Sequence, residues 1–157
     1  MKITFLSILL SITSSLANAS SPVPAELSRL IPVGMTSYQA QGETADGAKC
    51  QFRISNNSFG FAADILVMGE QGHLDSRRLG KFQIGLGHNL VGSIQQTANV
   101  LTATSYHVAE ESYSSDTRSI LTLTSKNGVI HKAKIRVESK FFFLFRTDVD
   151  ETCFLNE

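Results

Sequence analysis

Several features that mark common protein classes are scarce or missing in this sequence of 157 residues. It has 14 Lys and Arg against 14 Asp and Glu, so its charge gives no reason to expect nucleic acid as a partner. It has no tryptophan and only three tyrosines, whereas membrane-spanning β-barrels carry girdles of aromatic residues. After the first 19 residues no apolar segment approaches the roughly 20 residues of a membrane-spanning helix.

Recognisable catalytic and metal-binding motifs are missing as well. There is no Gly-x-Ser-x-Gly elbow, and no two of the four histidines have the i, i+4 spacing of a helical metal motif. The glycines at positions 80, 85, 87 and 92 are not followed by the Lys-Ser or Lys-Thr of a phosphate loop. We therefore predict no cofactor and no metal ligands, and we assign no catalytic residue.

The first 19 residues have the three parts of a secretory signal. Lys2 gives a positive start, an apolar stretch runs from Ile3 to Ile12, and Ala17-Asn18-Ala19 has the small side chains that a signal peptidase accepts. We expect cleavage after Ala19 and delivery to the periplasm or the outside of the cell. The remainder, 20–157, is predicted to be a single β domain in which 20–34 form a helical or extended lead-in.

Cys50 and Cys153 are the only cysteines. In an oxidising compartment, two cysteines so far apart in sequence most simply form one disulfide, and two buried free thiols are the alternative. The bond would close a loop of about 100 residues and hold an early strand beside the last segment of the chain.

From Met35 onward the apolar residues mostly recur at every second position, which is the period of β-strands. The pattern is clearest in Ala48–Ser55 and recurs in Phe61–Met68, Arg78–Leu86, Val100–Val108, Arg118–Ser125 and Val129–Glu138. Closely spaced strands without intervening helical patterns predict an all-β antiparallel meander of about eight or nine strands. We favour a closed or strongly curled barrel, which leaves no exposed edges, over a two-sheet sandwich.

Two Gly-containing turns allow the strand register to be predicted. A two-residue loop at Asn127-Gly128 would place Leu123 opposite Lys132, whereas a three-residue loop starting at Lys126 would place it opposite His131. We predict the three-residue loop because it keeps the apolar residues together, and we predict the same form at Ala45-Asp46-Gly47.

Two segments fit a strand less clearly. The apolar residues in and beside Pro24–Ile31 fall at helical spacing, and proline is tolerated in a first turn, so we predict a helix of about two turns across one end of the sheet. Leu90–Gln96 also lies in a stretch with helical spacing, but Gly92 weakens a helix, and we predict a strand.

The segment Lys140–Arg146, KFFFLFR, places five large apolar residues in a row between two cations. A continuous run of this length is typical of a strand that is covered on both faces, and this is our first interpretation. The alternatives are a patch that binds an apolar ligand or a protein partner, and a contact with lipid.

These observations favour a non-enzymatic binding protein for an apolar small molecule or a protein partner. The alternatives are a structural envelope protein without a pocket and, third, a hydrolase without a recognisable motif. Binding residues tend to lie on loops of a rigid scaffold, so the loops Gly69–Arg78 and Glu110–Asp116 are candidate binding segments in addition to the apolar run. The contact residues that we predict are Phe141, Phe142, Phe143, Phe145, Arg77, Arg78 and Tyr113.

Overall fold

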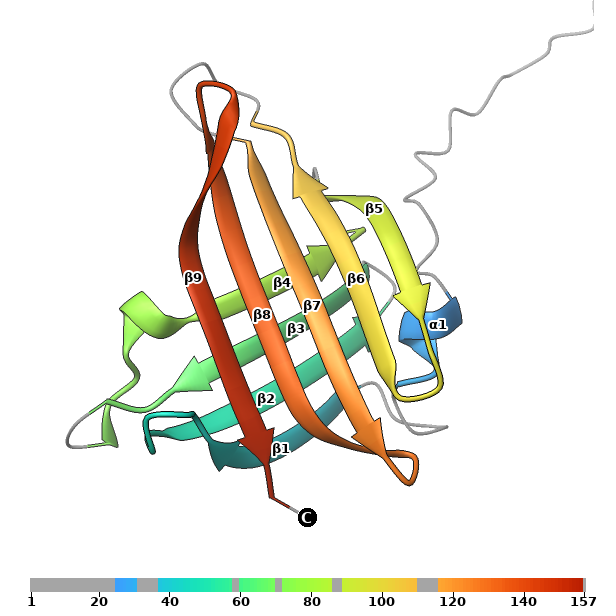
Figure 1. Cartoon of the computed structure of the whole chain (residues 1–157), viewed down its shortest axis with the longest axis vertical. Coiled ribbons are helices and arrows are strands. Elements are labelled where there is room, and N and C mark those ends of the chain that lie inside the picture. The colour runs from blue at the N-terminus through green and yellow to red at the C-terminus, as the bar shows by residue number, and fades with distance from the viewer. Residues whose placement is uncertain are drawn as a thin grey trace, which may run out of the picture.

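The computed structural model of the chain describes residues 25–30, 37–57, 60–69, 72–85, 89–109 and 116–156, and the predicted signal segment and its cleavage point lie outside them. Nearly all of the described residues lie in β-strands or the short turns between them (Figure 1). In chain order the elements are α1 (Ala25–Ser28), β1 (Ser37–Glu43), β2 (Lys49–Asn57), β3 (Gly60–Val67), the 3-10 turn η2 (Ser76–Arg78), β4 (Gly80–Ile84), β5 (Asn89–Gln96), β6 (Val100–His107), β7 (Thr117–Lys126), β8 (Val129–Phe141) and β9 (Leu144–Leu155). The predicted all-β class is confirmed, as is the strand at Leu90–Gln96.

All nine strands belong to one antiparallel sheet with the order β4-β3-β2-β1-β9-β8-β7-β6-β5. Strands β4 and β5 stand at opposite ends of this order and are not paired with each other. Among the described strands the sheet is therefore open, and the closed barrel that we favoured is not confirmed.

The sheet folds over on itself, so that β1–β4 lie across β6–β9 at a steep angle (Figure 1). Large apolar side chains from the two parts meet between them and are fully buried: Phe52, Phe61 and Phe82 on one side, and Leu121 and Ile135 on the other. This core explains the period of two, because every second side chain of these strands faces the opposite part of the sheet.

The predicted disulfide is confirmed, and it lies where the sheet folds over. Cys50 of β2 and Cys153 of β9 are bonded, with their Cα atoms 5.9 Å apart and both residues buried. Strand β1 lies between β2 and β9, and Gly42 of β1 pairs with both Cys50 and Leu155. A Cβ atom at Gly42 would stand 2.0 Å from the backbone oxygen of Phe154, so only glycine allows β1 and β9 to approach this closely.

The described part of the predicted N-terminal helix is a single turn, α1. Its Leu27 is fully buried in the core, which agrees with the apolar spacing of this segment. Pro24 and Ile31, the ends of the two-turn helix that we predicted, lie outside the described residues.

One of the two turn predictions is confirmed and the other is wrong. In the first hairpin Thr44 N donates to Ala48 O at 2.9 Å and Gly47 has a φ of 81°, as the three-residue loop requires. In the second hairpin, β7–β8, Lys126 pairs with Val129 across a two-residue loop.

The β7–β8 hairpin keeps its apolar residues together by a different route. The register shifts next to Thr124, which pairs with Lys132, so that His131 is the extra residue of a bulge. Leu123 consequently faces Ala133 and not His131. The physical requirement was identified correctly, but a bulge within the strand satisfies it, and our prediction considered only the loop length.

Candidate binding surface at the β8–β9 hairpin

The apolar run at 140–146 forms the end of a hairpin and not the doubly covered strand that we predicted. Strand β8 ends at Phe141, β9 begins at Leu144, and these two residues pair across the hairpin. Phe142 and Phe143 alone make the turn, and Phe142 has a φ of 55°. The prediction was wrong because an unbroken apolar run has no period, so it does not distinguish a buried strand from an uncovered turn.

Five consecutive apolar side chains are exposed at this end of the molecule, and we call them the hairpin tip. Their exposed fractions are 69% for Phe141, 78% for Phe142, 94% for Phe143, 77% for Leu144 and 38% for Phe145. At about 200 Å² for a whole aromatic residue, the four phenylalanines expose roughly 550 Å². The largest apolar patch of an ordinary monomer is about 300–600 Å², so the hairpin tip, with Leu144 added, is at or above the upper end of that range.

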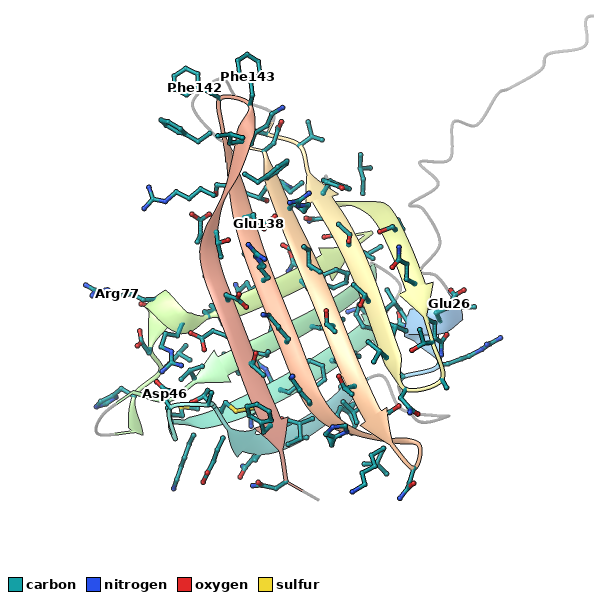
Figure 2. All side chains as sticks on the ribbon, viewed as in Figure 1. Glu26, Asp46, Arg77, Glu138, Phe142 and Phe143 are labelled. Atoms are coloured by element: carbon teal, nitrogen blue, oxygen red, sulfur yellow. A yellow bond between two sulfur atoms is a disulfide. The ribbon has the colours of Figure 1, made fainter. Side chains whose placement is uncertain are left out.

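The hairpin tip stands on a base of ion pairs. The guanidinium of Arg118 lies over the ring of Phe145, 4.3 Å from its centre. Arg118 Nε also donates to Glu138 Oε2 at 2.6 Å, and Arg136 Nε lies 2.9 Å from Glu138 Oε1. The Glu138 side chain is almost fully buried, and its hydrogen bond raises the pKa of Arg118 above the usual arginine value. Figure 2 shows Glu138 in the body of the sheet, below the labelled Phe142 and Phe143.

Two cations flank the hairpin tip on adjacent rungs of the hairpin. Lys140 pairs with Phe145 across the hairpin, and Arg146 pairs with Ser139. Lys140 Nζ lies 3.5 Å from Asp116 Oδ2, a loose and partly exposed contact. Arg146 is exposed and makes no ion pair within the described residues. Positive charge therefore lies directly below the apolar residues, together with two carboxylates: Asp116 beside Lys140, and Asp148, which accepts a hydrogen bond from Ser139.

A second cluster of ion pairs lies far from the hairpin tip, beside a shallow hollow of about 670 Å³. Arg78 of η2 reaches Asp46 in the β1–β2 turn at 2.9 Å and Glu151 of β9 at 2.8 Å. Hydrogen bonds from Thr44 and then from Arg78 lower the pKa of Asp46 to about 2. Asp46, Arg78 and Glu151 are thus paired with one another, and the cluster acts as a clamp between three parts of the fold.

A groove of about 380 Å³ follows the unpaired edge of β4. Its walls include Lys81 and Gln83 of β4, Thr117 and Ser119 of β7, and Val137 of β8. It is open and mixed in character, and it lacks the concentration of apolar or charged groups seen at the hairpin tip.

The structure brings some of the predicted contact residues together and separates others. Phe141, Phe142, Phe143 and Phe145 share the hairpin tip, which also contains Leu144. Arg77, exposed on η2, projects from one side of the molecule at a distance from Phe142 and Phe143 (Figure 2). Arg78 is held by its two carboxylates. Tyr113 lies outside the described residues.

The turn itself was missed, although strand length could have revealed it. Alternation from Val129 runs into the apolar run without a turn residue between them, and the combined segment 129–145 is far longer than the usual 3–10 residues of a strand. A reversal within the segment was therefore required, and it occurs inside the apolar run, at Phe142-Phe143.

Neither a metal-binding cluster nor a membrane-crossing helix occurs among the described residues. No group of three or more His, Cys, Asp or Glu side chains there could hold a metal ion. His131, at the bulge of β8, is half-buried, and its Nδ1 atom is buried without a hydrogen-bond partner among the described residues. No helix among these residues has the length and apolar character needed to cross a membrane.

The chain was also compared with known proteins. No family model matches it, and no match is found among curated proteins or among solved structures. Any functional conclusion therefore depends on the sequence and on the geometry described above.

Proposed function

We propose that this protein is a non-enzymatic binding protein that acts outside the cytoplasm and holds its partner with the hairpin tip of β8–β9. The observation that carries the proposal is the exposure of five consecutive apolar side chains, which reaches 94% at Phe143. Uncovered apolar surface of this size is unfavourable in water and commonly marks an interaction site.

Backbone geometry at the turn supports the same conclusion. A φ of 55° is unfavourable for a bulky residue such as Phe142, at about 1–2 kcal/mol, and turns of this kind normally have glycine or asparagine there. A phenylalanine in a position that suits glycine lowers stability without being covered by the rest of the fold. Strain of this kind tends to occur where a side chain is needed for function.

The interior of the fold is less suited to binding. Fully buried side chains, among them Phe52, Phe61 and Phe82, occupy the space between the two parts of the sheet. The hollows beside Arg78 and along β4 are open to solvent. We therefore favour a partner that meets the outside of the molecule over a small molecule enclosed in a barrel.

Two features support an extracytoplasmic location. The N-terminal 19 residues have the pattern of a secretory signal, and the bond between Cys50 and Cys153 is of a kind that persists in oxidising compartments. Export would also place the hairpin tip in the cell envelope or outside the cell, where its partner would have to be.

Site-specific photocrosslinking in the producing cell tests the proposal. A photoreactive amino acid replaces Phe143, and in a matched control it replaces Val129, which is 57% exposed at the opposite end of β8. We expect adducts, of protein or of lipid, from position 143 and not from position 129. A hairpin tip that gives no more adduct than the control would contradict the proposal.

A further inference from the structure

We propose that the hairpin tip binds the surface of a lipid bilayer, with Phe142, Phe143 and Leu144 among the acyl chains and with Lys140 and Arg146 at the level of the headgroups. This inference rests on the proposed function and specifies its partner. Three properties of the hairpin favour a bilayer over a protein: the chemistry of its side chains, its shape and the position of its charges.

The side chains of the hairpin tip contain no polar atom. Anchors of protein–protein interfaces are enriched in Trp, Tyr and Arg, which combine apolar area with a hydrogen-bonding group, and leucine is under-represented among them. Phenylalanine and leucine instead partition well into hydrocarbon, which offers no hydrogen-bond partner. Four Phe and one Leu are therefore better matched to acyl chains than to a protein groove.

The shape of the surface favours a fluid partner. Exposure is greatest at the turn, where Phe143 is 94% exposed, and falls to 38% at Phe145 on the first rungs of the hairpin. Figure 2 shows Phe142 and Phe143 projecting beyond the turn, away from the sheet. A protein would need a preformed cavity for such a projection, whereas a bilayer surface accommodates it without one.

The backbone of the turn also limits how deep the insertion can be. Phe142 and Phe143 lie beyond the last strand pair, Phe141–Leu144, and backbone groups that lack partners cannot be carried into hydrocarbon at low cost. Because the side chains extend past the backbone, they can enter the acyl region while the turn stays among the headgroups. Helices that lie in the interface bury their apolar face to a similarly shallow depth of about 5–10 Å.

The charges lie where headgroups would meet them. Strands rise about 3.4 Å per residue, so the rung that carries Lys140 lies roughly 7 Å or less below the turn. Arg146 lies on the next rung and makes no ion pair within the described residues, whereas Lys140 is near Asp116. We therefore expect Arg146 to supply most of a modest preference for anionic lipids.

Binding to vesicles tests the inference, and the absence of tryptophan in the chain provides a clean probe. The full chain carries Phe143→Trp or, as a control, Val129→Trp, and is mixed with phosphatidylcholine vesicles with and without phosphatidylglycerol. On addition of vesicles we expect a blue shift of the tryptophan fluorescence, and its quenching by brominated acyl chains, for the tryptophan at position 143 only. Reversible binding on the order of 10⁴ M⁻¹ or weaker is expected for so small an apolar anchor.

Two further variants separate the apolar contribution from the charged one. Phe142→Ser, added to Phe143→Trp, should weaken binding to both kinds of vesicle by roughly 10- to 50-fold. Arg146→Gln should weaken binding about fivefold on vesicles with phosphatidylglycerol and should leave binding to phosphatidylcholine unchanged. Thermal melting of each variant shows whether it is folded.

The possible results distinguish this inference from the proposed function. If position 143 forms photoadducts with a protein in the cell while the chain does not bind either kind of vesicle, the bilayer inference is overturned and the proposed function stands. If neither vesicles nor photoadducts are found, both are overturned. Equal signals from the two tryptophan positions would overturn the assignment of the hairpin tip as the inserted element.

Discussion

The strain at the β8–β9 turn can be measured by replacing each of its two residues with glycine. Phe142 has a φ of 55°, whereas the φ of Phe143 is not in the left-handed region. Both rings are largely exposed, so Phe142→Gly and Phe143→Gly each remove little buried surface. The two variants also have nearly the same unfolded chain, and the comparison between them therefore reports mainly on the backbone at position 142.

The expected difference is about 1 kcal/mol in favour of Phe142→Gly. Relief of the left-handed conformation stabilises this variant by about 1–2 kcal/mol relative to a bulky residue. Part of the gain is lost because the Phe142 ring meets the Phe141 ring edge to face, with centres 4.8 Å apart, a contact worth at most about 0.5–1 kcal/mol at an exposed position. For a chain of this length the remaining difference corresponds to roughly 2–4 °C in Tm.

Thermal unfolding followed by circular dichroism, together with urea titration at neutral pH, measures this difference. We expect Phe142→Gly to unfold at the higher temperature of the two variants. Equal stabilities, or a lower stability for Phe142→Gly, would refute the view that the turn is centred on Phe142-Phe143 with the first residue strained.

Three further predictions concern the scaffold, and denaturant titration checks each of them. Gly42→Ala should lower the free energy of unfolding by about 2 kcal/mol or more, because the added Cβ would lie 2.0 Å from Phe154 O. Gly69→Ala, whose Cβ would have its nearest atom at 3.6 Å, should change stability little. Similar values for the two variants would count against the close approach of β1 and β9 at Gly42. Asp46→Asn should be less stable than the parent at pH 7, and this difference in stability should close as the pH falls from about 4 to about 2. The folded pKa of Asp46, about 2, lies below its ordinary value of 3.8, so the parent loses the stabilisation by this carboxylate as it becomes protonated. A difference that stays constant with pH would show that the ionised carboxylate does not stabilise the fold. Glu138→Ala should cost about 1.5–3 kcal/mol, because it removes the charge-assisted contacts of a buried carboxylate with Arg118 and Arg136. Asp64→Ala, in the more exposed pair with Arg53, should cost less than about 1 kcal/mol, and the reverse order would be inconsistent with the base of the hairpin.

Much of the fold could be predicted because it follows from local pattern. The period of two identified strands such as Lys49–Asn57 and Val100–His107, since one face of each is buried against the opposite part of the sheet. Asp46-Gly47 gave the correct turn because the positive φ of Gly47 is a property of that residue type. The Cys50–Cys153 bond was predicted by the small number of cysteines together with the expected compartment.

The features that could not be predicted depend on contacts between distant segments. Whether the sheet closes depends on how β4 and β5 meet, and no local signal encodes their separation. The bulge at His131 was missed because a turn motif fixes the loop and not the register farther along the strands.

The hairpin tip was assigned to the wrong environment for a related reason. Apolar character predicts burial, and Phe141–Phe145 contradict that rule because they are exposed. Such exceptions are expected where function requires a surface that folding alone would not select.

The exposure of the hairpin tip is tested most directly by thiol labelling. The two native cysteines are bonded to each other, so Phe143→Cys introduces the only free thiol, and Ala103→Cys places one at a fully buried position for comparison. We predict that a maleimide modifies the folded Phe143→Cys protein as fast as the protein unfolded in urea, while Ala103→Cys is protected until it unfolds. Protection of both positions in the folded protein would show that the phenylalanines are covered, and the proposed binding surface would not exist.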